Sequence, residues 1–376
     1  MPHLVAIDLP GGPRFVDELR RQWDQGNAVL PIDRRLPAPA RAALLDALRP
    51  DRLVDVDGQH ELPGDGVDEG DALVMPTSGS TGAPKGAVLT HSAVEASALA
   101  SSTRLGTTAS DTWLACLPLA HVGGMSVITR ALIGGSGLVV HDGFDSDLVE
   151  RAARDGATAV SLVATALRRI DPMLFRVILL GGSRPPDDLP SNVHTTYGMT
   201  ETGSGVVYDG VPLDDVEVRI ADDGEVLLRC PMQLRCYRDG STPVDADGWM
   251  HTGDIGRLRD DGRLHVDGRR GDVVVTGGEK VWPDPVEAVL ADHPAVAEVA
   301  VAGVPDPEWG SRVVAWLVLR PGHPVPSAAE LRDVVTERLP AYCAPKEIRI
   351  VDHLPRTALG KVQRHRLQGS GTPAGK

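Results

Sequence analysis

The stretch PTSGSTGAPKGAVLTHS, residues 76–92, follows an apolar run at residues 72–75 and leads into a segment with a helical pattern. Glycine and hydroxyl side chains dominate it, and such a loop brings backbone N–H groups close to an anion, most often phosphate. A plain surface turn is the alternative, because glycine and serine are common in turns. The P-loop of NTPases needs Gly-Lys-Ser/Thr, whereas Lys85 stands between Pro84 and Gly86. We expect a phosphate-binding loop of another kind, between a strand and a helix.

The composition narrows the classes of ligand. The chain of 376 residues has 38 basic and 52 acidic residues, and its net charge of −14 disfavours a nucleic-acid or membrane-surface binder. The four cysteines form no CxxC pair and no zinc spacing, so we expect buried or free thiols in a reducing compartment. We find no signal-sequence pattern at the N-terminus and no apolar run of the ~18 residues that span a membrane. These features predict a cytoplasmic protein.

Hydrophobic periodicity predicts the fold class. Residues 15–175 alternate helical and strand-like segments, which indicates a parallel, layered α/β sheet with ligands bound where strands end in loops. From Val216 onwards, short strands separated by Asp-Gly turns indicate hairpins. A small α+β pattern follows, with helices expected at 284–291 and 327–338 and strands at 296–302, 313–319 and 347–351. We therefore predict a large N-terminal α/β domain with a β-rich subdomain (1–270), a small α+β domain (271–367) and a disordered tail (368–376).

Four further motifs carry chemistry. They are TYGMTETG (195–202), GWMHTGDIG (248–256), GRRGDVVVTGGEKV (268–281) and LPRTALGKVQRHRL (354–367). Together with the glycine-rich loop they resemble, in order and wording, the signature motifs of the adenylate-forming superfamily of acyl-CoA synthetases, adenylation domains and luciferases. Pro76 stands where that family usually has Tyr or Phe, at a position that does not face phosphate. The resemblance covers about residues 72–367 and implies the adenylate-forming enzyme fold, with a mobile small domain.

The resemblance also implies a reaction. An ATP-, Mg²⁺- and coenzyme A-dependent acid–thiol ligase would join a carboxylate to AMP and then pass the acyl group to the thiol. Two other classes stay open: a stand-alone adenylation enzyme that loads a carrier protein, and a nucleotide-binding protein without chemistry. In each case the partners are small molecules or a carrier, and a homodimer is left open.

The resemblance implies roles for individual residues. Lys85 would hold the β- and γ-phosphates with the loop residues Thr77, Ser78, Gly79, Ser80, Thr81 and Gly82. Glu201 would bind Mg²⁺, and Lys361 would contact the carboxylate and the α-phosphate while charge is transferred. Asp254 would accept the ribose hydroxyls and Arg269 would support the ribose or phosphate. The remaining ATP-site residues would be Gly181, Gly182, Ser183, Tyr197, Gly198 and Thr200.

Each of these assignments has a plain structural alternative. Asp254 could be an ordinary turn residue, and Glu201, Arg269 and Lys361 could be solvated surface charges. The catalytic set implied by the resemblance is Lys361, Glu201, Thr200 and His121.

The second half-reaction needs a different arrangement of the two domains. The resemblance implies a hinge at Gly271, where glycine allows a wide range of backbone angles. Gly277, Gly278 and Lys280 would line the channel for the pantetheine arm of coenzyme A.

The stretch LPLAHVGGM (117–125) resembles the family's loop at the pocket for the acid substrate. The resemblance implies that His121 acts as the gate of this pocket and that Gly198 lines it. A packed histidine at a helix start is the alternative. About 75 residues precede the phosphate loop, and this short start and the stretch 281–296 resemble the o-succinylbenzoate–CoA ligases of menaquinone synthesis.

Arg130 lies nine residues beyond His121 among apolar neighbours. Inside a pocket it could pair bidentately with a second carboxylate of the substrate. The alternative is an arginine that reaches solvent along its aliphatic stem. We expect an aromatic or cyclic dicarboxylic acid, with o-succinylbenzoate favoured over another carboxylic acid.

Overall fold

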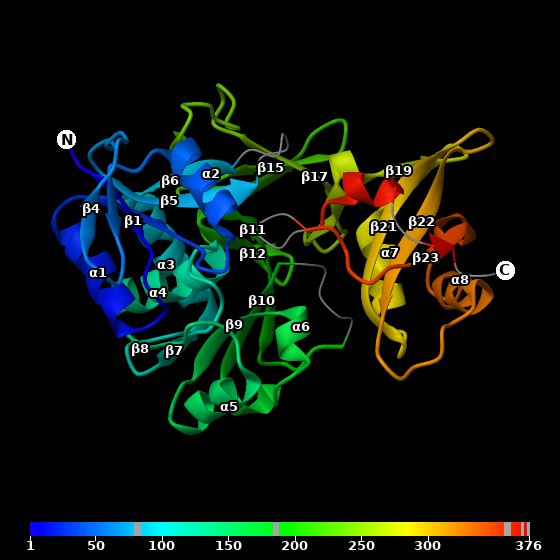
Figure 1. The fold of residues 1–376 in the computed structure, drawn as a ribbon, viewed down its shortest axis with the longest axis horizontal. Helices are drawn as coiled ribbons and strands as arrows, with labels where there is room; N and C mark the ends of the chain where they lie inside the picture. The colour runs from blue at the N-terminus through cyan, green and yellow to red at the C-terminus, as the bar shows by residue number, and fades with distance from the viewer. Residues whose placement is uncertain (79–83, 183–187, 357–361, 370–371, 374–376) are drawn as a thin grey trace. The chain divides into compact units, whose positions relative to one another are not determined.

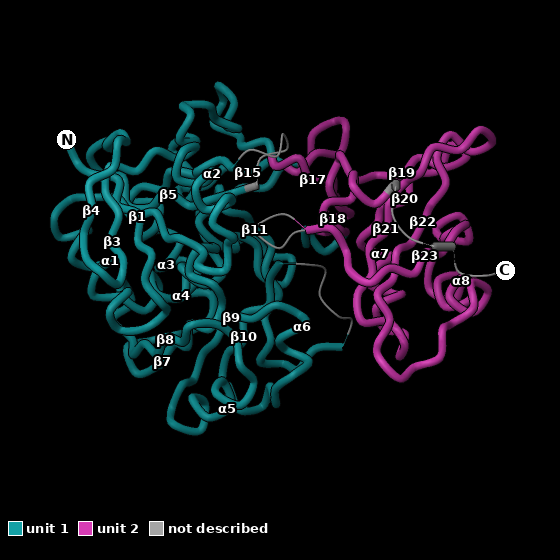
Figure 2. Tube along the Cα trace, viewed as in Figure 1, with its two compact units in different colours: residues 1–219, 227–251, 260–264 teal, residues 220–226, 252–259, 265–376 magenta. Residues whose placement is uncertain are grey.

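The computed structural model describes residues 1–78, 84–182, 188–356, 362–369 and 372–373. These residues form two compact units (Figure 2). Unit 1 comprises residues 1–219, 227–251 and 260–264, and unit 2 comprises residues 220–226, 252–259 and 265–376. The predicted domain boundary lies at residues 270 and 271, where the sequence pattern changes from hairpins to a small α+β unit. That boundary stays a prediction.

The first sheet of unit 1 has the strand order β16-β6-β5-β2-β1-β3-β4. Its strands, in chain order, are β1 (Leu4–Ile7), β2 (Ala28–Pro31), β3 (Arg52–Val54), β4 (Gln59–Glu61), β5 (Asp71–Ser78), β6 (Pro84–Thr90) and β16 (Cys236–Tyr237). The pairs β5–β2, β2–β1 and β1–β3 are parallel, whereas β4, β6 and β16 pair antiparallel with their neighbours. The sheet thus has a parallel centre and antiparallel edges.

The second sheet has the order β13-β12-β11-β10-β9-β7-β8. Its strands are β7 (Thr112–Ala115), β8 (Gly137–Val140), β9 (Ala159–Val163), β10 (Val177–Gly181), β11 (Val193–Met199), β12 (Ser204–Tyr208) and β13 (Val211–Pro212). The strands from β8 to β11 pair in parallel, and β12 and β13 add antiparallel pairs at one edge. The helices of this part of the chain are α1 (Pro13–Asp24), α2 (Ala38–Leu48), α3 (His91–Leu105), α4 (Val122–Gly134), α5 (Ser146–Arg154), α6 (Ala164–Leu167) and the 3₁₀ helix η1 (Pro172–Leu174).

The helices α3 and α4 pack against each other; α3 contacts both sheets, and α4 contacts the second sheet (Figure 1). α3 contacts β5, β6 and β12, while α4 contacts β7, β8, β9 and β12. Small residues on α3, among them Ala93, Ser97, Ala98 and Ser101, are buried and permit this close packing. The predicted layered α/β architecture is confirmed.

One local prediction is wrong. The glycine-rich loop connects two antiparallel strands, β5 and β6, and not a strand and a helix. The sequence after the loop contains the apolar residues Ala87, Val88 and Leu89, which are buried in β6. The helix α3 begins only at His91, where the Thr90 side chain accepts a hydrogen bond from the backbone N of Ala93 and caps the helix.

A four-stranded sheet, β14-β15-β17-β18, follows, as the hairpin pattern beyond Val216 predicts. Its strands are β14 (Glu217–Ile220), β15 (Glu225–Arg229), β17 (Met250–Leu258) and β18 (Leu264–Arg269). The last sheet has the order β20-β19-β22-β23-β24, with β21 paired to β22. Its strands are β19 (Val274–Thr276), β20 (Glu279–Val281), β21 (Val296–Asp306), β22 (Gly310–Leu319), β23 (Glu347–Ile350) and β24 (Thr372–Pro373). Beside them lie α7 (Pro283–Ala291), α8 (Ala328–Thr336), η3 (Arg270–Asp272), η4 (Ala341–Cys343) and η5 (Arg364–Gly369).

The tail differs in part from the prediction of disorder. Residues 368 and 369 belong to η5, and the strand Thr372–Pro373 pairs with β23. The backbone of this short segment is therefore held by a sheet edge, and residues 370–371 and 374–376 lie outside the described residues.

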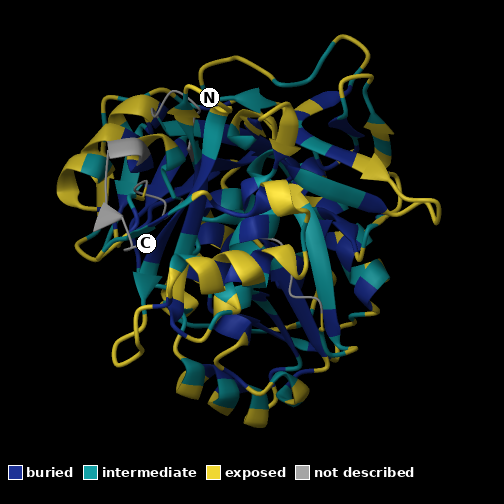
Figure 3. Ribbon diagram, turned by 90° about the vertical axis from the view of Figure 1, so that its right-hand side faces the viewer, coloured by how far each residue is buried: buried dark blue, intermediate teal, exposed yellow. Residues whose placement is uncertain are grey.

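Buried residues concentrate on the strands and on the inner faces of the helices (Figure 3). Burial raises the pKa of the Cys116 thiol to about 12 and that of the Cys230 thiol to about 11, and all four cysteines are free. Among the described helices, none combines the length and the apolar character needed to cross a membrane.

Candidate active site

The described ends of the glycine-rich loop face each other across the β5–β6 hairpin. Thr77 pairs with Lys85, and Ser78 pairs with Pro84. The predicted phosphate-binding residues Gly79, Ser80, Thr81 and Gly82 lie outside the described residues. Lys85 therefore stands at the base of the loop, on the strand that leaves it.

Three side chains from one short segment surround the ammonium group of Lys85. Its Nζ lies 4.6 Å from the centroid of the Tyr237 ring, 3.5 Å from Oγ of Ser241 and 3.7 Å from Oδ2 of Asp239. The Lys85 side chain is 35% exposed. The cation is attracted to the electron-rich ring face yet stays accessible to a ligand.

Glu201 lies in the short 3₁₀ helix η2 (Thr200–Thr202), directly after β11. Its Oε1 accepts a hydrogen bond of 2.8 Å from the Tyr237 hydroxyl, and its backbone oxygen accepts one of 2.7 Å from the backbone N of Leu234. The described residues contain no cluster of three or more side chains that could hold a metal ion. A Mg²⁺ ion bound to Glu201 would take its other ligands from phosphates and water, as this ion commonly does.

Tyr197 and Gly198 lie near the end of β11, and Thr200 begins η2 directly before Glu201. A register shift between Tyr197 and Gly198 marks an irregularity in the pairing with β12. A Cβ atom on Gly198 would lie 2.2 Å from the backbone oxygen of Ser204, so only glycine fits there. The motif thus has a structural reason for its glycine, whether or not the residue also contacts ATP.

Gly181 ends the parallel strand β10 and Gly182 follows it, at a strand end where the α/β architecture predicts ligands. Gly182 has φ of +90°, which favours glycine, and a Cβ atom on Gly181 would lie 3.0 Å from Oγ1 of Thr196. Ser183, predicted with them, lies outside the described residues.

His121 is the N-cap residue of α4, and its Nε2 lies 3.7 Å from Oδ2 of Asp33. Arg35 forms two hydrogen bonds with the Asp33 carboxylate, at 2.8 and 2.7 Å. Burial by itself raises the pKa of Asp33, but the hydrogen bonds and charge of Arg35, with a contribution from His121, hold it below its usual value. The predicted gate residue therefore lies next to an ionised carboxylate that the motifs did not reveal.

Arg130 is 1% exposed, which excludes the alternative of an arginine that reaches solvent. Its Nε donates to Oγ of Ser101 at 2.8 Å, its Nη2 lies 3.5 Å from Oγ of Ser204, and its guanidinium carbon lies 4.8 Å from the centroid of the Trp113 ring. Among the described residues, no carboxylate pairs with Arg130 and its Nη1 has no hydrogen-bond partner. Burial lowers the pKa of this guanidinium, while the neighbouring Tyr208 acts in the opposite direction.

Tyr237 joins two of the predicted residues, Lys85 and Glu201, and sequence reasoning missed it. It belongs to β16, a strand of two residues that pairs with β6. A strand of two residues is too short to show an alternation of apolar and polar residues, so the sequence pattern gave no indication of a role for Tyr237. Asp33 was missed for a related reason, since its partner His121 is distant in the sequence.

In unit 2, Asp254 and Arg269 lie together. Nε of Arg269 lies 2.9 Å from Oδ1 of Asp254, and its Nη1 donates to the backbone oxygen of Thr252 at 2.7 Å. The backbone N of Asp254 donates to Oγ1 of Thr252 at 3.0 Å, and Asp254 is 7% exposed. Asp254 thus lies within β17 and is fixed from two sides, unlike an ordinary turn residue. Its ribose role stays a prediction.

Gly277 and Gly278 form the two-residue turn between β19 and β20. Their φ angles are +58° and +87°, the positive values that a tight hairpin turn of type I′ needs at both positions. A Cβ atom on Gly277 would lie 2.8 Å from Cε3 of Trp309, whereas one on Gly278 would meet no atom within 4 Å. Lys280 is exposed in β20. The glycine pair is explained by the turn, and its role in a coenzyme A channel stays a prediction.

Gly277→Ala is expected to lower the free energy of unfolding by at least about 1–2 kcal/mol, because a side chain is disfavoured at positive φ and would also clash with Trp309. Gly271→Ala is the matched control. Gly271 lies in η3 without a positive φ, and a Cβ atom there would meet nothing within 4 Å. Gly271→Ala should therefore change the free energy of unfolding by no more than about 0.5 kcal/mol. Urea unfolding of the full chain measures both, and equal effects would contradict the turn assignment.

Lys361, the predicted catalytic lysine, lies outside the described residues, but the chain on either side of it is described. Arg356 and Val362 form an antiparallel bridge, and the backbone N of Gln363 donates to the oxygen of Pro355 at 2.8 Å. The guanidinium of Arg364 binds three carboxylates, those of Asp272, Asp284 and Glu287. The described residues that flank this segment are therefore held by backbone and ion-pair contacts.

Comparison with known proteins agrees with these observations. The sequence pattern of the AMP-binding enzyme family matches residues 27–237, more than half of the chain, and that of the AMP-binding enzyme C-terminal domain matches residues 285–361. A probable 2-succinylbenzoate–CoA ligase of Mycobacterium tuberculosis is 40% identical over 346 residues, which cover 84% of this chain and 90% of that protein. The 2-succinylbenzoate–CoA ligase of Bacillus subtilis is 37% identical over 335 residues, 79% of this chain and 68% of that protein.

Solved structures are similar in fold. The o-succinylbenzoate CoA synthetase of Bacillus subtilis, in complex with the acyl-adenylate intermediate, has a TM-score of 0.88 at 30% identity and covers 100% of this chain and 89% of that one. The same synthetase in complex with ATP and a magnesium ion has a TM-score of 0.84 at 30% identity, over 97% of this chain and 89% of that one. The chain therefore belongs to the AMP-binding enzyme family.

Proposed function

We propose that this protein is an ATP-dependent, AMP-forming acid–thiol ligase whose acid is o-succinylbenzoate. In the first step a carboxylate oxygen bonds to the α-phosphorus of ATP and pyrophosphate leaves. In the second step the sulfur of coenzyme A bonds to the acyl carbon, AMP leaves, and the thiol proton is released. The five motifs and the functions named for the similar ligases support this reaction.

The residues of unit 1 suit the first step, which brings two anions together. Lys85 presents an accessible ammonium group at the base of the phosphate loop. Bound Mg²⁺ would neutralise phosphate charge, and Glu201, with one oxygen already held by Tyr237, is the residue that would bind it. Positioned charges of this kind lower the barrier where negative charge accumulates.

The single observation that carries the choice of acid is the buried guanidinium of Arg130. An isolated buried charge is strongly unfavourable unless it is paired and hydrogen-bonded. Among the described residues, Arg130 has hydroxyl and aromatic neighbours but no carboxylate, and the hydroxyl of the neighbouring Tyr208 is also buried without a hydrogen-bond partner. A second carboxylate on the substrate would supply the missing anion, which a diacid has and a fatty acid lacks.

We place the second step at unit 2. The small turn of Gly277 and Gly278 would leave room for the pantetheine arm, with Lys280 beside it, and rotation about Gly271 would exchange the two domain arrangements. A Cβ atom on Gly271 would meet no atom within 4 Å, so local packing does not require glycine at this position. We also place the protein in the cytoplasm, where ATP and coenzyme A are available and free thiols persist.

Gly271→Pro is expected to slow thioester formation while sparing adenylate formation, because proline fixes φ near −65° and restricts the swivel. Single-turnover measurement of the two half-reactions tests this, with Gly271→Ala as the control that keeps most of the backbone freedom. Thioester formation at the wild-type rate in the proline variant would show that the hinge lies elsewhere.

Acid-dependent release of pyrophosphate tests the proposed substrate. The wild-type protein would be given o-succinylbenzoate, its analogue without the ring carboxylate, benzoate and a long-chain fatty acid, each with ATP and Mg²⁺. We expect the highest kcat/KM with o-succinylbenzoate and a large loss with the analogue. Preference for any of the monoacids would refute the choice of acid.

A further inference from the structure

Tyr237 contacts two of the charged groups that have a role in the proposed first step, Lys85 and Glu201. The face of its ring lies 4.6 Å from Nζ of Lys85, and its hydroxyl donates a hydrogen bond of 2.8 Å to Oε1 of Glu201. Among the described residues, Lys85 forms an ion pair with the exposed Asp239 at 3.7 Å, and none joins it to Glu201. One side chain therefore touches a cation with its ring and an anion with its hydroxyl.

The backbone around Tyr237 fixes the position of this ring. Tyr237 pairs with Ala87 of β6, two residues after Lys85. Its backbone N donates to the oxygen of Ser241 at 2.7 Å, and the backbone N of Arg238 donates to the oxygen of Gly86 at 2.7 Å. The strand that carries Lys85 therefore also holds Tyr237.

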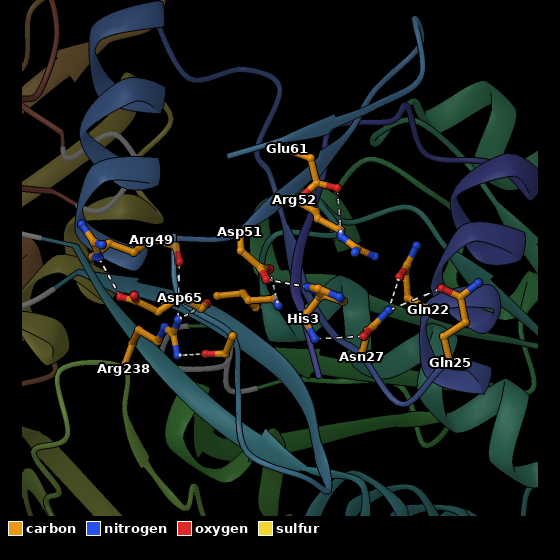
Figure 4. A network of polar contacts seen from close by, with 12 residues as sticks. His3, Gln22, Gln25, Asn27, Arg49, Asp51, Arg52, Glu61, Asp65 and Arg238 are labelled. Atoms are coloured by element: carbon orange, nitrogen blue, oxygen red, sulfur yellow. Dashed lines mark hydrogen bonds and ion pairs between the residues drawn. The ribbon is translucent and has the colours of Figure 1, made fainter. Parts of the chain in front are cut away.

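The side chain of Arg238, the residue after Tyr237, takes part in a second network of polar contacts (Figure 4). Its guanidinium donates to the backbone oxygens of Gly66 at 2.8 Å, Asp65 at 2.6 Å and Leu48 at 3.1 Å. Arg49, at the end of α2, pairs with the Asp65 carboxylate in the same network. These hydrogen bonds hold the residue next to Tyr237, and such support favours a residue that positions others.

We propose that Tyr237 is a positioning residue that separates and orients the Lys85 cation and the Glu201 carboxylate for a nucleotide triphosphate with its divalent cation. This inference rests on the proposed function. The hydroxyl holds one carboxylate oxygen of Glu201 and leaves the other for the cation, as outer hydrogen-bond partners of metal ligands do. The ring holds the ammonium group of Lys85 apart from that carboxylate. Without this separation, Lys85 and Glu201 could form an ion pair, and neither would then be available to bind phosphate or the metal ion.

Two substitutions separate the two contacts. Tyr237→Phe removes the hydroxyl and keeps the ring, whereas Tyr237→Leu removes both. In the phenylalanine variant we expect the Mg²⁺ concentration for half-maximal adenylation to rise about tenfold. The KM for ATP at saturating Mg²⁺ should stay within about twofold, because the Lys85 contact remains. In the leucine variant we expect the same rise for Mg²⁺ and, in addition, a weakening of ATP binding of about three- to tenfold.

Calorimetric titration with ATP at several Mg²⁺ concentrations provides a readout that needs no acid. Tyr342→Phe, which removes an exposed phenol from unit 2, is the matched control and should change neither dependence. Unchanged Mg²⁺ and ATP dependence in the two Tyr237 variants would overturn the inference, as would an equal loss of kcat in both without any change in those dependences. A wild-type protein that binds no ATP with Mg²⁺ would overturn it too. Normal binding without acid-dependent pyrophosphate release would instead refute the proposed function, and the binding comparison would still decide the role of Tyr237.

Discussion

Lys361→Ala is expected to slow acyl-adenylate formation about 10²–10³-fold, since a positioned charge of this kind contributes roughly 3–4 kcal/mol to the transition state. The positive charge is needed where the acid carboxylate and the α-phosphate meet. In the second half-reaction that charge has no such task, so thioester formation from preformed acyl-adenylate should remain mostly intact. Single-turnover assays with ATP plus acid, and separately with acyl-adenylate plus coenzyme A, measure the two steps.

Arg366→Ala is the matched control for Lys361. Arg366 is exposed in the same segment, so its replacement removes one positive charge without removing the proposed catalytic group. We expect both half-reactions to stay near the wild-type rate in this variant. An equal loss in both half-reactions after Lys361→Ala would contradict the role assigned to that lysine.

Arg130→Ala is expected to raise the KM for o-succinylbenzoate well above tenfold while leaving the KM for ATP unchanged. The reason is that loss of one partner of a buried, hydrogen-bonded charge pair typically costs about 2–5 kcal/mol of binding. The analogue without the ring carboxylate should lose much less, because it never forms the pair. Steady-state kinetics with both acids measures this difference.

Alanine also removes volume from a residue that is 1% exposed, so a second variant is needed. Arg130→Met keeps much of the volume and removes the charge. Replacement of a buried charge by an apolar side chain is often neutral or stabilising, so we expect no loss of thermal stability together with the same rise in KM. A methionine variant with the wild-type KM for the diacid would contradict the carboxylate-binding role.

Much of the fold could be predicted because its signals are local. The alternation of helical and strand-like segments in the sequence predicts the parallel sheets. The helices and strands expected in the small domain correspond to α7, α8, β21, β22 and β23. The prediction failed at β6, because an apolar run of three residues between a loop and a helix has too little length to reveal a strand.

In the site, residues within contiguous motifs were predicted, whereas residues brought together by tertiary packing were not. Lys85, Glu201, Asp254 and Arg269 lie in contiguous motifs, so their residue types and spacing are visible in the sequence. Tyr237 was not predicted, because its function depends on a pairing with β6 that joins residues about 150 positions apart. The burial of Arg130 could be suspected from its apolar neighbours, but its contacts with Trp113 and Ser101 arise only from tertiary packing.

The central claim is that this single chain joins o-succinylbenzoate to coenzyme A through an adenylate. The most direct measurement is mass-spectrometric quantification of all products after the wild-type protein is mixed with o-succinylbenzoate, ATP, Mg²⁺ and coenzyme A. The account predicts o-succinylbenzoyl-CoA, AMP and pyrophosphate in equal amounts, with no thioester when ATP or coenzyme A is omitted. Pyrophosphate and acyl-adenylate without any thioester in the complete mixture would contradict it, as would the absence of any product that depends on o-succinylbenzoate.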